Sequence, residues 1–563
     1  FRQVDATLVF ANNLLRVTAK QTNQPAFGVK NANITLSPLY NPDRRSRALN
    51  ISLALSGELS PLLTILDHPR INRLVGTGLS PLTSKGITEA TFSATGTVPH
   101  GQKLILSDII ADATIDDAVI GNLPFNQTLE DGALVVSYDN DALIISGSAV
   151  FDGIYSDFSY ERKQNGEIEL NAKVPANAAF AQTLSRVTGH SIEGSVGGRF
   201  ALSGIQGSHS YSLSARTDIT AAGISIDALN WAKLPGETGQ ASGLLKFENG
   251  KLSAIEAIDV MAGSLSGKGR LAFQPDRQIS LGYFENVTFP GNELQTVLLE
   301  NTGKSAVKLT AEGSLLNLVP LRRNEGVTKG IALEFDVTAS RIIAGPKITL
   351  SGNLKGATQK NGDGRATLLG SLIYASKPLL REGTIDAQFG PSGEVLQGVG
   401  LIGGGEATLS FRPAGNGRSE LEISSQNGGR VLKGLNIVDS IKEGDLTLVT
   451  RFLNPQFSEY DTQIDIKDFS VTEAPRAIRA FSVLSLAGLY SLVEGSGTKF
   501  VRGEAKILSR EGQHKLEKVR ATGNAVGVSM LGQFNRQTGE VDVSGNLVPV
   551  NQVNKLLGLL PVV

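Results

Sequence analysis

The feature that most constrains this chain is a strict alternation of apolar and polar residues that recurs along its whole length. Segments 49–55, 168–174, 331–337 and 541–547 each place an apolar residue at every second position. A period of two residues puts the apolar side chains on one face of a strand and the polar side chains on the other. Strands with one wet face and one dry face are typical of antiparallel sheets, so the alternation predicts an all-β fold.

Turn signals separate these segments about every ten to fifteen residues. Asn165-Gly166 and the run 361–364, Asn-Gly-Asp-Gly, are examples, and such pairs favour tight hairpins. Glycine supplies 63 of the 563 residues, above its usual share of about 7%. The composition therefore agrees with a chain of many short strands joined by turns.

Few segments predict helices. The run 60–74 begins like a helix, but Pro69 must break or kink it. Three segments share a strand-like run that ends in Pro-x-Asn, at 174–177, 289–292 and 548–551. Asparagine is a good helix N-cap, so each predicts a short amphipathic helix after it. The apolar residues of these helices are Phe180, Leu184 and Val187, then Leu294, Val297 and Leu298, then Val553, Leu556, Leu557 and Leu560.

One apolar helix is predicted at about 474–494, with Thr472, Glu473 and Pro475 at its start and Gly495 at its end. Between 480 and 493 it carries no charge, a run of about 14 residues, below the roughly 18–20 that cross a bilayer. Its apolar residues cover most of its circumference, so it needs apolar contact on more than one side. These candidate lipid-contacting residues are Ile478, Phe481, Leu484, Leu486, Leu489, Leu492 and Val493.

The number of half-apolar strands exceeds what these helices can cover. No linker divides the chain, so a set of separate sandwiches is disfavoured. We therefore predict a long curled antiparallel sheet that forms an elongated apolar groove, with a few short amphipathic helices. About thirty strands at ~4.8 Å each would extend on the order of 100–150 Å. An apolar groove of that length needs a ligand, a partner or a membrane to cover it.

Motifs for catalysis, metals and cofactors are weak. The net charge is −1, with 19% charged residues, which disfavours nucleic acid as a partner. The five histidines are scattered, and cysteine is absent. The run 398–403 matches GxGxxG, but a strand-like segment follows it, so a glycine-rich hairpin is predicted. The run 263–269 lacks the Ser or Thr of a phosphate-binding loop. We predict no cofactor, no metal and no enzymatic activity.

The C-terminal segment resembles the C-terminal region of large AsmA-like proteins of Gram-negative bacteria, of the YhdP type. The resemblance covers about 434–563 and is weaker at 66–90. It rests on a segment that ends in Ala-Pro, 469–475, and on Gly-x-Gly-x-x-Phe after the apolar helix, 495–500. Two closing segments, 539–549 and 554–561, also match. Accordingly, 1–433 is predicted to be a repetitive β-groove region, and 434–563 an AsmA-like C-terminal region.

The resemblance implies a bridge-like, β-taco-like periplasmic protein. The resemblance implies an anchor to the inner membrane by an N-terminal helix; no such helix is seen in the sequence, so we expect the chain to be a fragment or mature region of a longer protein. The resemblance also implies phospholipid movement between inner and outer membranes, with acyl chains and both membranes as partners and a role in outer-membrane lipid homeostasis. The compartment and the lipid cargo come from the resemblance alone, whereas the apolar groove follows from the residue pattern.

Two functions outside lipid transport stay open at this stage. A scaffold could assist outer-membrane protein assembly by offering sheet edges to client strands, that is, by β-augmentation. An extracellular β-solenoid or adhesin would instead carry polar or aromatic stripes and a closed sandwich core. The main hypothesis is a lipid-binding or lipid-conducting groove, in which acyl chains occupy the dry face and headgroups stay in water at the open edge.

Overall fold

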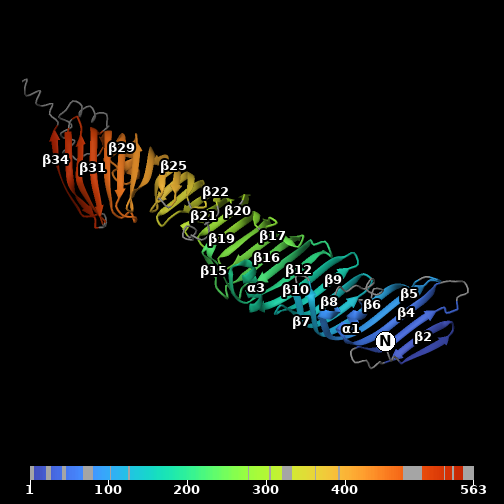
Figure 1. Cartoon of the computed structure of the whole chain (residues 1–563). Coiled ribbons are helices and arrows are strands. Elements are labelled where there is room, and N and C mark those ends of the chain that lie inside the picture. The colour runs from blue at the N-terminus through green and yellow to red at the C-terminus, as the bar shows by residue number, and fades with distance from the viewer. Residues whose placement is uncertain are drawn as a thin grey trace, which may run out of the picture. The chain divides into compact units, whose positions relative to one another are not determined.

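The computed structural model describes residues 5–20, 27–40, 46–66, 80–101, 103–123, 127–276, 278–303, 306–319, 332–361, 363–390, 393–472, 497–510, 512–524, 526–535 and 538–549. Of these residues 74% lie in strands and 6% in helices. The chain divides into two compact units, Phe1–Pro290 (unit 1) and Gly291–Val563 (unit 2). Figure 1 shows the elements of each unit in the order of the chain.

Unit 1 is an open antiparallel sheet in which each strand pairs with the next strand of the sheet along the chain. Its strands are β1 Ala6–Ala11, β2 Leu14–Lys20, β3 Phe27–Ser37, β4 Arg47–Glu58, β5 Ser84–Val98, β6 Ile105–Leu123, β7 Gln127–Tyr138, β8 Ala142–Phe151, β9 Ile154–Lys163, β10 Glu167–Asn177, β12 Val196–Ile205, β13 Tyr211–Asp218, β16 Gly239–Glu248, β17 Lys251–Ala262, β18 Leu265–Phe273 and β19 Ile279–Phe289.

The remaining elements of unit 1 gather at one side of the sheet, which we call the helix rim. Because neighbouring strands are antiparallel, β4, β10 and β13 all end at this rim, and the extra elements follow those ends (Figure 1). They are α1 Leu59–Leu66, the 3₁₀ turn Pro81–Thr83, α3 Ala178–Thr188, and a small sheet of β11 Ser191–Gly194, β14 Ala222–Ile226 and β15 Trp231–Lys233 with the 3₁₀ turn Asp227–Leu229. At the opposite side, the turn rim, the described connections are short turns such as 139–141 and 164–166.

Unit 2 is a second open sheet. Its strands are β20 Asn292–Gly303, β21 Ala306–Asn317, β22 Ala332–Ile343, β23 Ile348–Thr358, β24 Gly364–Tyr374, β25 Lys377–Phe389, β26 Val395–Ile402, β27 Gly405–Gly415, β28 Arg418–Ser425, β29 Ile441–Phe452, β30 Tyr460–Val471, β31 Thr498–Arg510, β32 Gln513–Thr522, β33 Val526–Asn535 and β34 Val541–Pro549. Helix α5, Gly428–Gly434, follows β28. The pairing of β21 with β22 is parallel, and the other printed registers of this unit are antiparallel.

These sheets confirm the predicted fold class: an all-β chain of long, open antiparallel sheet with few helices. The alternating segments 49–55 and 168–174 lie in β4 and β10, and 541–547 lies in β34. Residues 332–337 of the remaining segment, 331–337, begin β22. The GxGxxG run is a glycine-rich hairpin as predicted, because Ile402 of β26 pairs with Gly405 of β27.

Of the three helices predicted after Pro-x-Asn, one is confirmed and one is wrong. Asn177 caps α3 as expected: its side chain accepts a hydrogen bond from the backbone N–H of Phe180, 2.7 Å away. The second Pro-x-Asn helix is wrong, because Asn292 begins β20 and the apolar residues Leu294, Val297 and Leu298 lie in that strand. Gly291 adopts a φ of +75° in a turn there, so no helix starts. The third such helix and the apolar helix 474–494 fall outside the described residues.

Candidate functional site

A continuous row of apolar residues crosses unit 1 from β3 to β19. Residues directly opposite one another on adjacent strands project from the same face of a sheet. The row, which we call the apolar ladder, contains Val29, Leu55, Ala90, Ala113, Val136, Ile145, Tyr160, Leu170, Leu202, Leu213, Leu245, Ile255, Leu271 and Gly282. No charged residue interrupts it.

The exposure of the apolar ladder is unusual for so apolar a row. Every member from Leu55 to Leu271 is half-buried, so nothing in the described part of the chain covers it fully. The residues that alternate with it, such as Glu169, Ser203 and Ser214, are exposed on the other face. The sheet therefore has a polar outer face and an apolar face that stays partly accessible.

The helix rim is where the apolar face is fully covered. Leu59 and Leu63 of α1 pack on Ile115 and neighbouring residues of β6 and β7. Farther along the sheet, α3 and the small sheet enclose a second cluster, which contains Ala181, Val196, Ile219, Ala222, Trp231 and Ala262. The two described helices of unit 1 thus lie on the apolar face, and they cover only the part of it that borders this rim.

Lys233 lies inside the second of these clusters with 2% of its surface exposed. Its ammonium group donates hydrogen bonds to the carbonyl oxygens of Thr220, Ala222 and Leu234, at 3.1, 2.9 and 3.1 Å. A buried ammonium is tolerable when its three donors are satisfied, as they are here. The lysine therefore fixes the small sheet to the helix rim.

A pocket of about 640 Å³ crosses β8 to β17, and most of its lining residues, such as Asp157, Lys173 and Arg199, belong to the polar alternation of their strands. One residue of each lining segment belongs to a row that shares the face of the apolar ladder, which we call the pocket row: Gly147, Phe158, Ala172, Phe200, Ala215 and Gly243. Four of these six residues are Gly or Ala. Phe158 and Phe200 are two strands apart, or roughly 9.6 Å.

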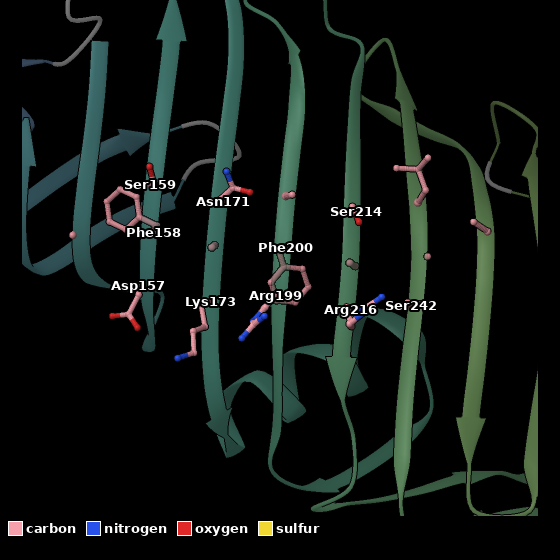
Figure 2. Close-up of a pocket in the computed structure, with 17 residues that line it drawn as sticks. Asp157, Phe158, Ser159, Asn171, Lys173, Arg199, Phe200, Ser214, Arg216 and Ser242 are labelled. Carbon is pink, nitrogen blue, oxygen red and sulfur yellow. The ribbon is translucent and has the colours of Figure 1, made fainter. Parts of the chain in front are cut away.

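The two pocket phenylalanines are held by other aromatic rings. Phe151 meets Phe158 edge to face at a centroid distance of 5.4 Å, and Phe180 of α3 meets Phe200 at 5.6 Å. Figure 2 shows Phe158 and Phe200 on separate strands, with Asp157, Lys173, Arg199 and Arg216 in a row beside them. Because these charged residues precede or follow pocket-row residues, alternation directs their side chains to the polar face.

A third row of the apolar face borders the turn rim and differs from the first two. This rim row contains Leu143, Arg162, Ile168, Gly204, Tyr211 and Phe247. Arg162 is half-buried and brings a guanidinium group to the apolar face. Beside it in the apolar ladder is Tyr160. Its pKa is raised, mainly by burial; Arg162 opposes this rise and Tyr211 adds to it.

Unit 2 carries a corresponding row that is more deeply buried. It contains Val297, Ala311, Val337, Leu354, Leu368, Ile385, Gly398, Leu409, Ile423, Leu448, Ile464, Ala505, Val519, Met530 and Gly545. Leu368, Ile423 and Leu448 are only 3, 1 and 3% exposed, and they belong to a core that also takes in Val431 and Leu432 of α5. The middle of this row is therefore well covered, whereas its last two members, Met530 and Gly545, are exposed.

The predicted lipid-contacting residues of the apolar helix, from Ile478 to Val493, lie outside the described residues. The structure does locate the ends of their segment. Thr472 donates its backbone N–H to the carbonyl oxygen of Ser440, which follows α5, and the chain resumes at Gly497 before β31. β30 therefore ends, and β31 begins, at the side of the sheet where α5 lies.

Neither the pocket row nor Arg162 was predicted from the sequence. A row that crosses six strands depends on cross-strand register, which the alternation does not specify. Arg162 had a signal, because it continues the alternation Phe158, Tyr160 onto the apolar face.

Other kinds of site are not evident in the described part of the chain. No group of three or more His, Asp or Glu side chains there could hold a metal ion. None of the helices described has the length and apolar character that a membrane span needs. Comparisons with protein-family models, curated proteins and solved structures give no match to this chain.

Proposed function

We propose that this protein binds lipid and conducts it along the apolar face of its sheet, without catalysis. The observation that carries the proposal is the apolar ladder, which stays half-buried from Leu55 to Leu271. Contiguous accessible apolar surface marks a ligand, partner or membrane site. Acyl chains fit this role because each buried CH2 contributes about 0.8 kcal/mol and the interaction needs no fixed direction.

The geometry of the two rims supports the same proposal. The helix rim is covered by α1, α3 and the small sheet, whereas the described turn rim carries only short connections. A lipid that lies on the apolar face could keep its headgroup in water at the turn rim. The AsmA-like resemblance extends the proposal to phospholipid transfer between the inner and outer membranes, by a periplasmic protein anchored to the inner membrane.

Native mass spectrometry of the purified chain tests this function. We expect phospholipid adducts that survive gentle ionisation and disappear after delipidation. A protein that carries no lipid as purified, and takes up none from phospholipid vesicles, would contradict the proposal.

One observation favours a second candidate, a scaffold that pairs with client strands. In the described structure β1 pairs only with β2, and Leu8, Val9 and Phe10 on it are 56, 46 and 68% exposed. An apolar strand with an unpaired edge can accept another strand. Site-specific crosslinking from Phe10 in the presence of unfolded outer-membrane proteins would detect such clients.

A further inference from the structure

On the polar face of unit 1 we infer a site for a phosphorylated sugar or polyol that carries at least two phosphate groups. Its phosphates are bound by Lys173, Arg199 and Arg216, which we call the basic row. Its hydroxyl groups are bound by small polar side chains beside that row. The site lies on the face opposite the apolar ladder, so it goes beyond the proposed lipid function.

The basic row crosses three neighbouring strands at one level of the sheet. Arg199 of β12 lies directly opposite Lys173 of β10 on one side and Arg216 of β13 on the other (Figure 2). All three residues are exposed. Residues opposite one another have Cβ atoms about 4.5–5.5 Å apart, so three cations leave the sheet within about 10 Å.

The same level of the sheet carries charges of alternating sign farther along. On β17, β18 and β19 it continues with Asp259, Lys268 and Glu285. Lys268 forms an ion pair with Asp259 at 3.2 Å. In the described part of the chain, by contrast, no ion pair or hydrogen bond engages a side chain of the basic row. Like charges directly opposite one another are unfavourable, so stability alone does not account for three consecutive cations.

Two acidic residues that border the basic row are engaged with their own strands or turns. Asp157, at the β9 end of the row, accepts a hydrogen bond from the hydroxyl of Tyr155 at 3.0 Å. Asp218 accepts the backbone N–H of Thr220 at 2.9 Å, and hydrogen bonds to this threonine lower the pKa of the carboxyl group. The three cations therefore stay available to an anion from solution.

Small side chains leave a hollow beside the basic row. The neighbouring level of the polar face holds Ser159, Asn171, Ala201 and Ser214 (Figure 2). Residues of both levels line the pocket of about 640 Å³. Hydroxyl and amide side chains both donate and accept hydrogen bonds, which is what the hydroxyl groups of a sugar require.

Charge and shape together select the ligand class. The planar donors of a guanidinium match the paired oxygens of a phosphate, and a lysine adds a point charge. One inorganic phosphate reaches only part of the basic row, whereas a bisphosphate spans it. The polar-face residues that line the pocket include no aromatic ring on which a nucleobase could stack. These features favour a phosphorylated sugar over a nucleotide.

Isothermal titration of the full chain with fructose 1,6-bisphosphate tests the basic row. We expect the parent to bind it, to bind inorganic phosphate far more weakly, and not to bind fructose. Arg199→Gln and Arg216→Gln are each expected to weaken binding about tenfold. Arg199→Lys keeps the charge and is expected to retain much of the affinity. Lys268→Gln removes a charge from the same level that is already paired, so it is expected to change little.

Three results would overturn the assignment. A parent chain that does not bind the bisphosphate has no such site. An equal loss in Lys268→Gln would mean that long-range charge rather than a site explains the binding. Thermal unfolding of Arg199→Gln is expected at the temperature of the parent or slightly above it, because like charges are separated. A clearly lower temperature would show that the arginine holds the sheet together instead.

Filling the hollow gives a second test. Ser214→Trp is expected to weaken the bisphosphate about tenfold with the basic row intact. Ser93→Trp, on the exposed polar face of β5, is expected to leave binding unchanged. Unchanged binding in a folded Ser214→Trp variant would remove the hollow from the site.

Vesicles distinguish a free ligand from a lipid head group of the same chemistry. Phosphatidylcholine vesicles with and without phosphatidylinositol 4,5-bisphosphate are sedimented with the protein. Binding that needs the bisphosphate lipid and is reduced by Arg216→Gln would extend the site to head groups. Binding of fructose 1,6-bisphosphate alone would restrict it to free ligands.

A variant of the opposite face separates this site from the proposed lipid function. Leu202→Asp, in the apolar ladder, is expected to leave the affinity for fructose 1,6-bisphosphate unchanged even where bound lipid is lost. Loss of bisphosphate binding in a folded Leu202→Asp variant would contradict a separate site on the polar face.

Discussion

Phe180 of α3 meets Phe200 of β12 edge to face, with ring centroids 5.6 Å apart and planes at 85°. This contact joins the helix rim to the pocket row, so it couples the covered and the accessible parts of the apolar face. We expect Phe180→Ala to lower the free energy of unfolding by about 2–3 kcal/mol, since it removes a half-buried ring and this aromatic pair. Denaturant unfolding measures the loss, and Arg186→Ala, on the exposed side of α3, is expected to change little. A Phe180→Ala variant as stable as the parent would show that α3 does not depend on this contact.

A charge in the apolar ladder should stop lipid binding. Leu202→Asp places a carboxylate in the middle of the row, where an acyl chain cannot solvate it. The expected result is loss of most bound lipid in native mass spectrometry, with the strand signal in circular dichroism retained. Ser203→Asp adds the same charge to the polar face of the same strand and is expected to keep its lipid. Equal lipid content in the two variants would remove the apolar ladder from the proposal.

The same Pro-x-Asn motif should have different effects in its two described contexts. Asn177→Ala removes the N-cap of α3 and is expected to cost about 1 kcal/mol, seen as faster amide exchange in α3. Asn292 is 3% exposed, and its side-chain oxygen accepts the backbone N–H of Asn317 at 2.8 Å. Asn292→Ala is therefore expected to speed exchange at Asn317 and in β20, with no change in α3. Protection changes in α3 from both variants would contradict this separation.

We expect the stability of unit 2 to fall in acid because of Glu420. Its carboxylate, 15% exposed, accepts hydrogen bonds from Arg412 and, at 2.9 Å, from Nε of Arg451; both lower its pKa. A pKa below the unfolded value of 4.5 means that the stabilisation is complete above that pH. It is lost as the pH falls through the folded-state pKa.

We therefore expect Glu420→Gln to be about 1 kcal/mol less stable than the parent at pH 7, and the difference to shrink below pH 4. Urea unfolding of both proteins at several pH values gives this comparison. A difference that is constant with pH would assign the effect to shape rather than to charge.

Much of the fold could be predicted from the sequence because the alternation is local. The segments 49–55 and 541–547 are strands in the structure, and the Asn165-Gly166 pair does join β9 to β10. Local patterns were insufficient where neighbouring residues changed the outcome. Asn177 and Asn292 follow the same letters, but Gly291 turns the chain into a strand at the second position.

The site was harder to predict than the fold. Phe158, Ala172 and Phe200 are far apart in the sequence, and only the registers of β9, β10 and β12 place them in one row. A strand pattern says which face a residue occupies, but it does not say which residue lies opposite. The alternation also could not predict the depth of burial in unit 2. Leu368 and Leu170 occupy similar alternating segments, yet Leu368 is buried and Leu170 is half-buried.

The separation of the two rims has a consequence for how such a chain can change in length. In the described part of unit 1 the helices and the small sheet follow strands that end at one rim, while hairpins such as β16–β17 close at the other with as few as two residues. Gaining or losing two consecutive strands preserves the direction of every later strand. Duplication of a hairpin could therefore extend the span of the protein in small increments, with each side of the sheet keeping its character.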